Sequence, residues 1–123
     1  MRTAAVHGLL CMALALAGCE KHENSLSVTA TAYTSSPQET DSTPSVTAWG
    51  DTLKPGMKAI AVSRDLIDMG LTHQQDVKIQ GFDGSFRVLD KMNRRWEKRI
   101  DIYMDNNRKK ARNWGKQEVT IFW

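Results

Sequence analysis

Hydrophobic and polar residues alternate along several short segments of the chain. The apolar residues Leu26, Val28, Ala30 and Ala32 occupy every second position of the segment 26–33. This period of two predicts a β-strand with one buried face. Alternating or continuously apolar segments of similar length predict further strands at 59–62, 77–79, 86–89, 100–104 and 119–123.

Six or seven short strands separated by turn-forming residues are typical of a mainly β domain. Clusters of Ser, Pro, Gly and Asp between the apolar segments mark the connections, most clearly over 34–45 and 81–84. No internal repeat accompanies them. The pattern therefore predicts a single small barrel or sandwich.

Two segments have helical rather than strand character. Residues 65–69 predict about one helical turn that ends at Gly70. Residues 106–114 predict a longer helix, rich in Lys and Arg, that ends at Gly115. Asp105 precedes this helix, and we expect its carboxylate to cap the helix N-terminus.

The N-terminal residues have the character of an export signal. Arg2 precedes an apolar stretch over 4–16, which is too short to span a bilayer and long enough for the hydrophobic part of a secretory signal. The stretch ends in Leu16-Ala17-Gly18-Cys19, which resembles a bacterial lipobox. The alternative is a leader cleaved elsewhere, with Cys19 a free thiol.

The lipobox resemblance implies three parts of the chain. Residues 1–18 form the signal peptide, 19–27 the lipidated N-terminus with a polar tether, and 28–123 the folded domain. Acylated Cys19 would anchor the protein firmly, because two or three acyl chains bind a membrane stably whereas a single chain binds it only weakly. Glu20 follows in place of the Asp that retains lipoproteins at the inner membrane, which implies the periplasmic face of the outer membrane.

Composition narrows the functional classes. The 123 residues carry a formal charge of +3, with 41% hydrophobic and 25% charged residues, which fits one globular domain. Eleven of the 17 basic residues lie within 87–116. Such a face could bind cell-wall carboxylates or lipid phosphates, or could simply be solvated. An exported protein meets little nucleic acid, so we expect no nucleic-acid partner.

The sequence lacks the residue arrangements that metal binding, triad catalysis and phosphate binding need. His22 and His73 have no Cys or His at ligand spacing, so we expect no metal site and no cofactor. Neither a Ser-His-Asp triad nor a glycine-rich phosphate loop can be identified.

Two acids are the best candidates for catalysis. If Ile100 and Ile102 enter the core, Asp101 and Tyr103 must face the other side of the strand. Asp90 ends an earlier strand eleven residues before Asp101. Two neighbouring carboxyls can keep one proton near neutrality, which suits a general acid acting on a glycosidic bond. The alternative is that both acids pair with nearby arginines.

A series of short segments along the chain matches the pattern of a known family. In order, they are 29–33, 47–50, 54–56 with 60–62, 88–90, 99–103 and 111–115. Together they resemble the 3D domain family, which is named for three aspartates. The resemblance implies a six-stranded double-psi β-barrel with one or two short helices and lytic transglycosylase activity on the bond between N-acetylmuramic acid and N-acetylglucosamine in peptidoglycan.

Carried over by position, Asp101 would be the acid and then the base, and Asp90 its neighbour in the cleft. Apart from the resemblance, we expect Tyr103, Arg99 and Trp96 to contact the glycan, and we expect the protein to be a monomer. Two features depart from the family pattern: Ser63 stands where the third aspartate is usual, and 91–98 contain no glycine.

Three functions of different classes stay open. The first is the lytic transglycosylase anchored through Cys19, with peptidoglycan glycan strands and the membrane as its partners. The second is a barrel that binds cell-wall glycan without turnover. In the third the basic face binds lipid or protein and the acids are structural, which predicts that Asp101→Asn lowers the melting temperature.

Overall fold

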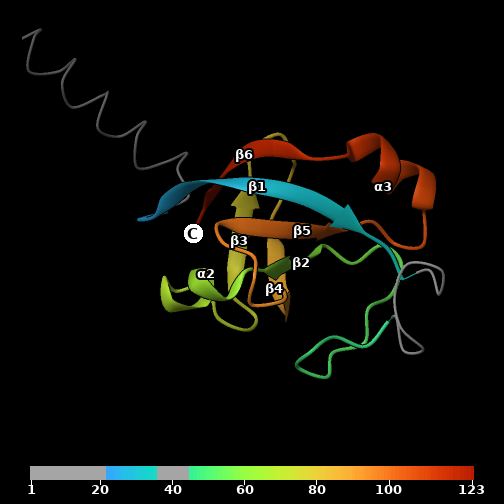
Figure 1. Cartoon of the computed structure of the whole chain (residues 1–123), viewed down its shortest axis with the longest axis horizontal. Helices are drawn as coiled ribbons and strands as arrows, with labels where there is room; N and C mark the ends of the chain where they lie inside the picture. Colours follow the sequence, from blue (N-terminus) through green and yellow to red (C-terminus); the bar gives the residue numbers. More distant parts are fainter. Residues whose placement is uncertain (1–21, 36–44) are drawn as a thin grey trace, which may run out of the picture.

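The computed structural model describes residues 22–35 and 45–123, and these form a closed six-stranded barrel with two short helices (Figure 1). Around the barrel the strand order is β1-β5-β2-β4-β3-β6. The strands are β1 (Ser25–Tyr33), β2 (Ala59–Val62), β3 (Asp76–Ile79), β4 (Phe86–Lys91), β5 (Arg99–Tyr103) and β6 (Gln117–Phe122). The predicted small six-stranded barrel is confirmed, and a sandwich is excluded because the sheet closes on itself.

Alternation along the strands fills the barrel interior. Ile100 and Ile102 of β5 are buried and pack with Ile60 and Val62 of β2. Each strand contributes such inward side chains, as the period of two predicts. The interior is therefore a continuous apolar core, and the residues between these positions face outward.

Strand pairing is mixed. β1 pairs with β5, and β2 with β4, in the parallel sense, while the other four pairs are antiparallel. Parallel partners need a long crossover, so the chain segments between them must pass the ends of the barrel. Helix α3 lies at the end toward which β1 and β5 run (Figure 1).

The two helices are short. Helix α2 spans Arg64–Asp68 and is followed by Gly70, as expected. Helix α3 spans Arg108–Trp114 and ends at Gly115, whose φ of 66° is the left-handed conformation that favours glycine.

The predicted capping role of Asp105 is wrong. The N-cap of α3 is Asn107, whose side chain accepts a hydrogen bond from the Lys110 backbone N–H. Asp105 lies two residues earlier with a φ of 58°, and its Oδ1 accepts a 2.7 Å bond from the Gly56 backbone N–H. The acid therefore fastens the turn before β2 to the end of β5 instead of capping the helix.

The first strand begins one residue before the predicted segment 26–33. β1 starts at Ser25, and Asn24 exchanges backbone hydrogen bonds with Trp123, so the ladder with β6 extends to the last residue of the chain. The signal peptide and Cys19 lie outside the described residues. Within 22–35 and 45–123, no helix is long and apolar enough to cross a membrane.

Gly70→Ala should destabilise the fold more than Gly50→Ala. Both glycines have positive φ, 105° and 88°, so both substitutions strain the backbone by about 1 kcal/mol. At Gly70 the added Cβ would also lie 3.2 Å from Trp123 Nε1, which itself donates to the Met69 carbonyl. At Gly50 nothing lies within 4 Å. Urea unfolding of both variants measures the difference, and equal losses would contradict the proposed clash.

Candidate functional site

Four outward-facing residues form a row across four adjacent strands. Thr31 of β1 is in register with Asp101 of β5, and Asp101 is in register with Ala61 of β2. On the other side Ala61 is in register with Asp90 of β4. Residues in register point to the same face of a sheet. Both candidate acids therefore face the same side, with the small side chain of Ala61 between them.

A β-bulge directs Asp90 outward. The register of β4 against β2 shifts between Ile60 and Ala61, so that β4 has one extra residue at this point. Val88 of β4 points into the core, and strict alternation would direct Asp90 to the core as well. The extra residue reverses this direction. The bulge thus puts Asp90 on the same face as Asp101.

The two acids line one cavity of about 270 Å³. Its other lining residues come from β1, β2, the end of β4 and the connection between β4 and β5: Tyr33, Ala61, Lys91, Met92, Asn93 and Trp96. Asp90 and Asp101 belong to the two strands that flank β2, so their backbones are about 10 Å apart. The cavity lies above Ala61, and its two sides carry one carboxyl each.

Asp101 keeps its proton unusually well. The pKa of its carboxyl is raised from 3.8 to about 6, mainly by burial and to a smaller extent by the charge of Asp90. A hydrogen bond of 3.1 Å from Thr31 Oγ1 and the charge of Arg99 act in the opposite direction. We expected the neighbouring carboxylate to be the main cause, but burial is the larger one. Asp101 can therefore hold a proton close to neutral pH.

Asp90 is held more firmly than Asp101. Its Oδ1 accepts hydrogen bonds of 2.9 Å from the backbone N–H groups of Ala48 and Lys91. Burial raises the pKa of Asp90, and these two bonds act against the rise. Bonds that favour the ionised carboxylate suit a fixed negative charge better than a proton donor.

Tyr33 belongs to the site, although the sequence pattern did not single it out. Its ring lines the cavity, and its hydroxyl is buried without a hydrogen-bond partner. Burial and then the charges of Asp90 and Asp101 raise the pKa of this hydroxyl above 10.0, so it stays protonated. Tyr33 lies two residues after Thr31, on the same face of β1. Only the parallel pairing of β1 with β5 reveals that this face meets Asp101.

Trp96 and Arg99 lie together beside Asp101. Trp96 lines the cavity, and the Arg99 guanidinium carbon is 3.9 Å from the centre of its ring. Two anchors hold this segment: the Arg99 backbone N–H donates to Ser63 Oγ, and the Lys98 backbone N–H donates to Asp65 Oδ2. The buried Ser63 therefore fixes the start of β5.

Tyr103 does not line the cavity between the acids. It is 4% exposed and packs with Leu53, Ala59 and Leu89 in a second apolar cluster. Its hydroxyl lies 3.2 Å from Ser35 Oγ. Tyr103 faces the outer side of β5, as alternation predicts, but the segment that contains Leu53 covers it there. Its contact with the glycan stays a prediction. Cys19, the predicted lipidation site, lies outside the described residues.

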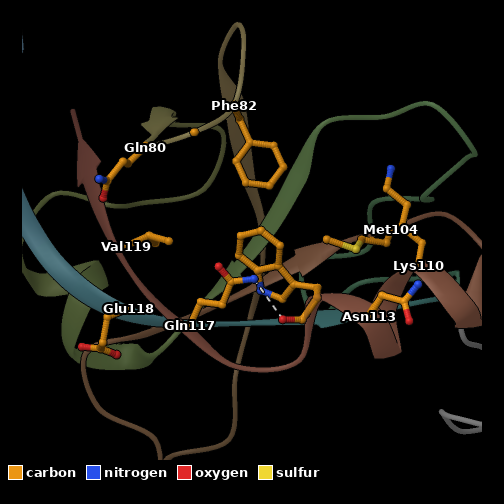
Figure 2. Close-up of a pocket in the computed structure, with 10 residues that line it drawn as sticks. Gln80, Phe82, Met104, Lys110, Asn113, Gln117, Glu118 and Val119 are labelled. Atoms are coloured by element: carbon orange, nitrogen blue, oxygen red, sulfur yellow. Dashed lines mark hydrogen bonds between the residues drawn. The ribbon is translucent and has the colours of Figure 1, made fainter.

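A larger cavity of about 590 Å³ lies elsewhere on the barrel (Figure 2). Phe82, Trp114 and Met104 supply its apolar lining. Its one acid, Glu118, accepts a 2.6 Å hydrogen bond from Thr29. In Figure 2 the dashed line is the bond from Gln117 Nε2 to the Trp114 carbonyl. Since it holds no pair of acids, this cavity is not the candidate catalytic site.

Comparison with known proteins and a search for metal ligands add little to this description. Neither the scan against protein-family models nor the search of curated proteins finds a match to this chain. Within residues 22–35 and 45–123, no group of three or more His, Cys, Asp or Glu side chains could hold a metal ion. The function is therefore inferred from the geometry of the cavity.

Proposed function

We propose that this chain is a lytic transglycosylase of the 3D type, which cleaves the β-1,4 bond between N-acetylmuramic acid and N-acetylglucosamine in peptidoglycan. The observation that carries the proposal is the position of Asp101: an outward-facing carboxyl beside a cavity, with its pKa raised to about 6. A carboxylic acid that is protonated near neutrality can act as a general acid.

The reaction needs one group that first gives and then takes a proton. Protonated Asp101 gives its proton to the glycosidic oxygen while the bond from that oxygen to the anomeric carbon breaks. The C6 hydroxyl of the same muramic acid residue attacks the anomeric carbon, and the Asp101 carboxylate takes the hydroxyl proton. The products are a 1,6-anhydro sugar and a free C4 hydroxyl, and the acid is restored without water.

The neighbouring groups fit this sequence of steps. Asp90, fixed by two backbone N–H groups, supplies a negative charge that stabilises the positive charge developing on the sugar ring. Thr31 donates to Asp101 and so supports its ionised form after the first proton transfer. Burial raises the pKa of Asp101 without an acid at position 63, so the serine there is compatible with the chemistry.

The proposed location follows from the N-terminal residues. Lipidated Cys19 would anchor the protein to the periplasmic face of the outer membrane, close to the peptidoglycan layer. The polar residues after Cys19 would separate the domain from the lipid surface.

Digestion of purified sacculi tests the proposal. The full-length protein, purified in detergent, is incubated with sacculi, and the released muropeptides are identified by mass spectrometry. We expect products that end in 1,6-anhydro-muramic acid, each lighter by one water than a hydrolysis product. Co-sedimentation with sacculi without any product would favour the alternative, a glycan-binding lipoprotein without turnover. Hydrolysis products alone would exclude the transglycosylase mechanism.

Ala61→Leu should block the cavity while leaving the core intact. Ala61 is 5% exposed and lies between the two acids, so a larger side chain extends into the space that the sugar needs. We expect kcat/KM on solubilised glycan to fall at least ~10-fold, because small displacements of substrate from the acid are costly. Ala61→Ser is the matched control and should retain most activity. Equal activity of the leucine and serine variants would show that substrate does not lie over Ala61.

A further inference from the structure

One cationic side chain lines the acidic cavity, and three more contact residues that line it. Lys91 lines the cavity directly. Arg64 Nε donates to the carbonyl of Met92, a lining residue. The guanidinium carbons of Arg95 and Arg99 are 4.8 and 3.9 Å from the ring centre of Trp96, another lining residue. We call these four residues the basic rim.

None of the four makes an ion pair with any residue that the structure describes. The ion pairs there join His73 to Asp51 and Arg87 to Asp76. Segment 91–98 contains one acid, Glu97, which is exposed. The rim therefore adds positive charge around the cavity, and the acids whose pKa its Lys91 and Arg99 lower are the cavity's own Asp90 and Asp101.

The cavity and its rim select opposite charges. Inside the cavity, the charge of Asp90, and that of Asp101 once it has given up its proton, disfavours an anion, so a neutral segment of ligand fits best between them. Around the cavity, the basic rim attracts an anionic group at a short distance from that neutral segment. A nucleic acid has a phosphate on every nucleotide and would bring negative charge to the acids as well.

We infer that the basic rim binds the carboxylates of the stem peptide, so that the preferred substrate is peptide-bearing glycan and not stripped glycan. This inference rests on the proposed function. The glycan backbone is a chain of neutral N-acetylated sugars, and muramic acid carries a peptide branch with free carboxylates. In such a polymer the neutral sugars fit the cavity, and the carboxylates of the peptide fit the basic rim.

The test compares glycan that carries its stem peptides with glycan from which the peptides have been removed, which leaves one lactyl carboxylate on each muramic acid. Solubilised glycan strands are used intact or after an amidase has removed the stem peptides, and kcat/KM is measured for both at low and high salt. We expect the peptide-bearing strands to be preferred about tenfold at low salt, because several partly exposed charge pairs contribute modestly. The preference should shrink at high salt, where screening is stronger. Equal rates on both glycans at low salt would overturn the inference.

Variants of the rim separate charge from structure. Arg64→Gln with Arg95→Gln should lower the rate on peptide-bearing strands more than the rate on stripped strands, and so reduce the preference. Arg64→Lys with Arg95→Lys keeps the charge and should restore most of the preference. Arg112→Gln, an exposed position on α3, is the matched control and should behave as the unchanged protein. A loss of activity on both glycans to the same extent would contradict a role in recognising the peptide.

A binding measurement keeps this inference distinct from the proposed function. If no product forms on either glycan, the proposed activity fails, and binding still decides the role of the rim. Calorimetric titration uses a soluble disaccharide with its stem peptide, the same disaccharide without it, and vesicles that contain anionic phospholipid. Tighter binding of the peptide-bearing form supports the inference. Equal binding of the two disaccharides, or binding of the vesicles alone, would overturn it.

Discussion

Asp101→Asn should abolish release of anhydro-muropeptides while leaving the barrel folded. Asparagine has nearly the same shape as aspartic acid but has no proton to give to the glycosidic oxygen. General acid–base catalysis contributes about 10²–10⁴-fold to a rate, so we expect a loss of that order in kcat. Quantification of anhydro-muropeptides by liquid chromatography and mass spectrometry measures it.

Asp76→Asn is the control for this substitution. Asp76 is an exposed carboxylate on β3 that pairs with Arg87 and lies outside the cavity, so its loss should change kcat little. Circular dichroism shows whether both variants keep the strand content of the unchanged protein. If Asp101→Asn retained more than about a tenth of the activity, another group would have to supply the proton.

The same substitution should stabilise the protein at neutral pH. Burial raises the pKa of Asp101 from 3.8 to about 6, so the folded state binds this proton more tightly than the unfolded state does. As pH rises from about 4 to about 6, the unfolded state releases this proton while the folded state still holds it, and stability falls by about 3 kcal/mol. Asparagine does not ionise and avoids this loss.

Unfolding in urea at two pH values tests whether Asp101→Asn stabilises or destabilises the protein. Near pH 4 the variant and the unchanged protein should be about equally stable, because Asp101 is then neutral in the folded state. At pH 7.5 the variant should be more stable by about 2–3 kcal/mol, which is the energy equivalent of the raised pKa. The hypothesis that the acids serve only the structure predicts the reverse, a lower stability of Asp101→Asn at neutral pH.

Periodicity predicted most of the fold. The segment 26–33 with its alternating apolar residues is a strand, and the inward positions of Ile100 and Ile102 follow from the same alternation. The sequence around the start of α3 did not identify the N-cap residue. Asp105 and Asn107 are both suitable N-caps, and the choice between them depends on the bond from Gly56, a residue 49 positions earlier in the chain.

The site was predicted only in part, because its geometry depends on strand pairing. Alternation was enough to place Asp101 on the outer face. Asp90 reaches that face only through the bulge in β4, and no local pattern marks this extra residue. Tyr33 was missed because β1 and β5 are parallel neighbours far apart in sequence. Tyr103 was assigned to the cleft because alternation does not show which outward residues are covered by the segment around Leu53.

Titration of the Asp101 side chain tests the central claim most directly, since the proposed chemistry needs this group to hold a proton near neutrality. The carboxyl carbon is followed by NMR across the pH range, with Asp101→Asn used to assign its signal. We expect this carboxyl to titrate with a pKa of about 6. A pKa for Asp101 at or below its ordinary 3.8 would contradict it, because the group could not then serve as the acid.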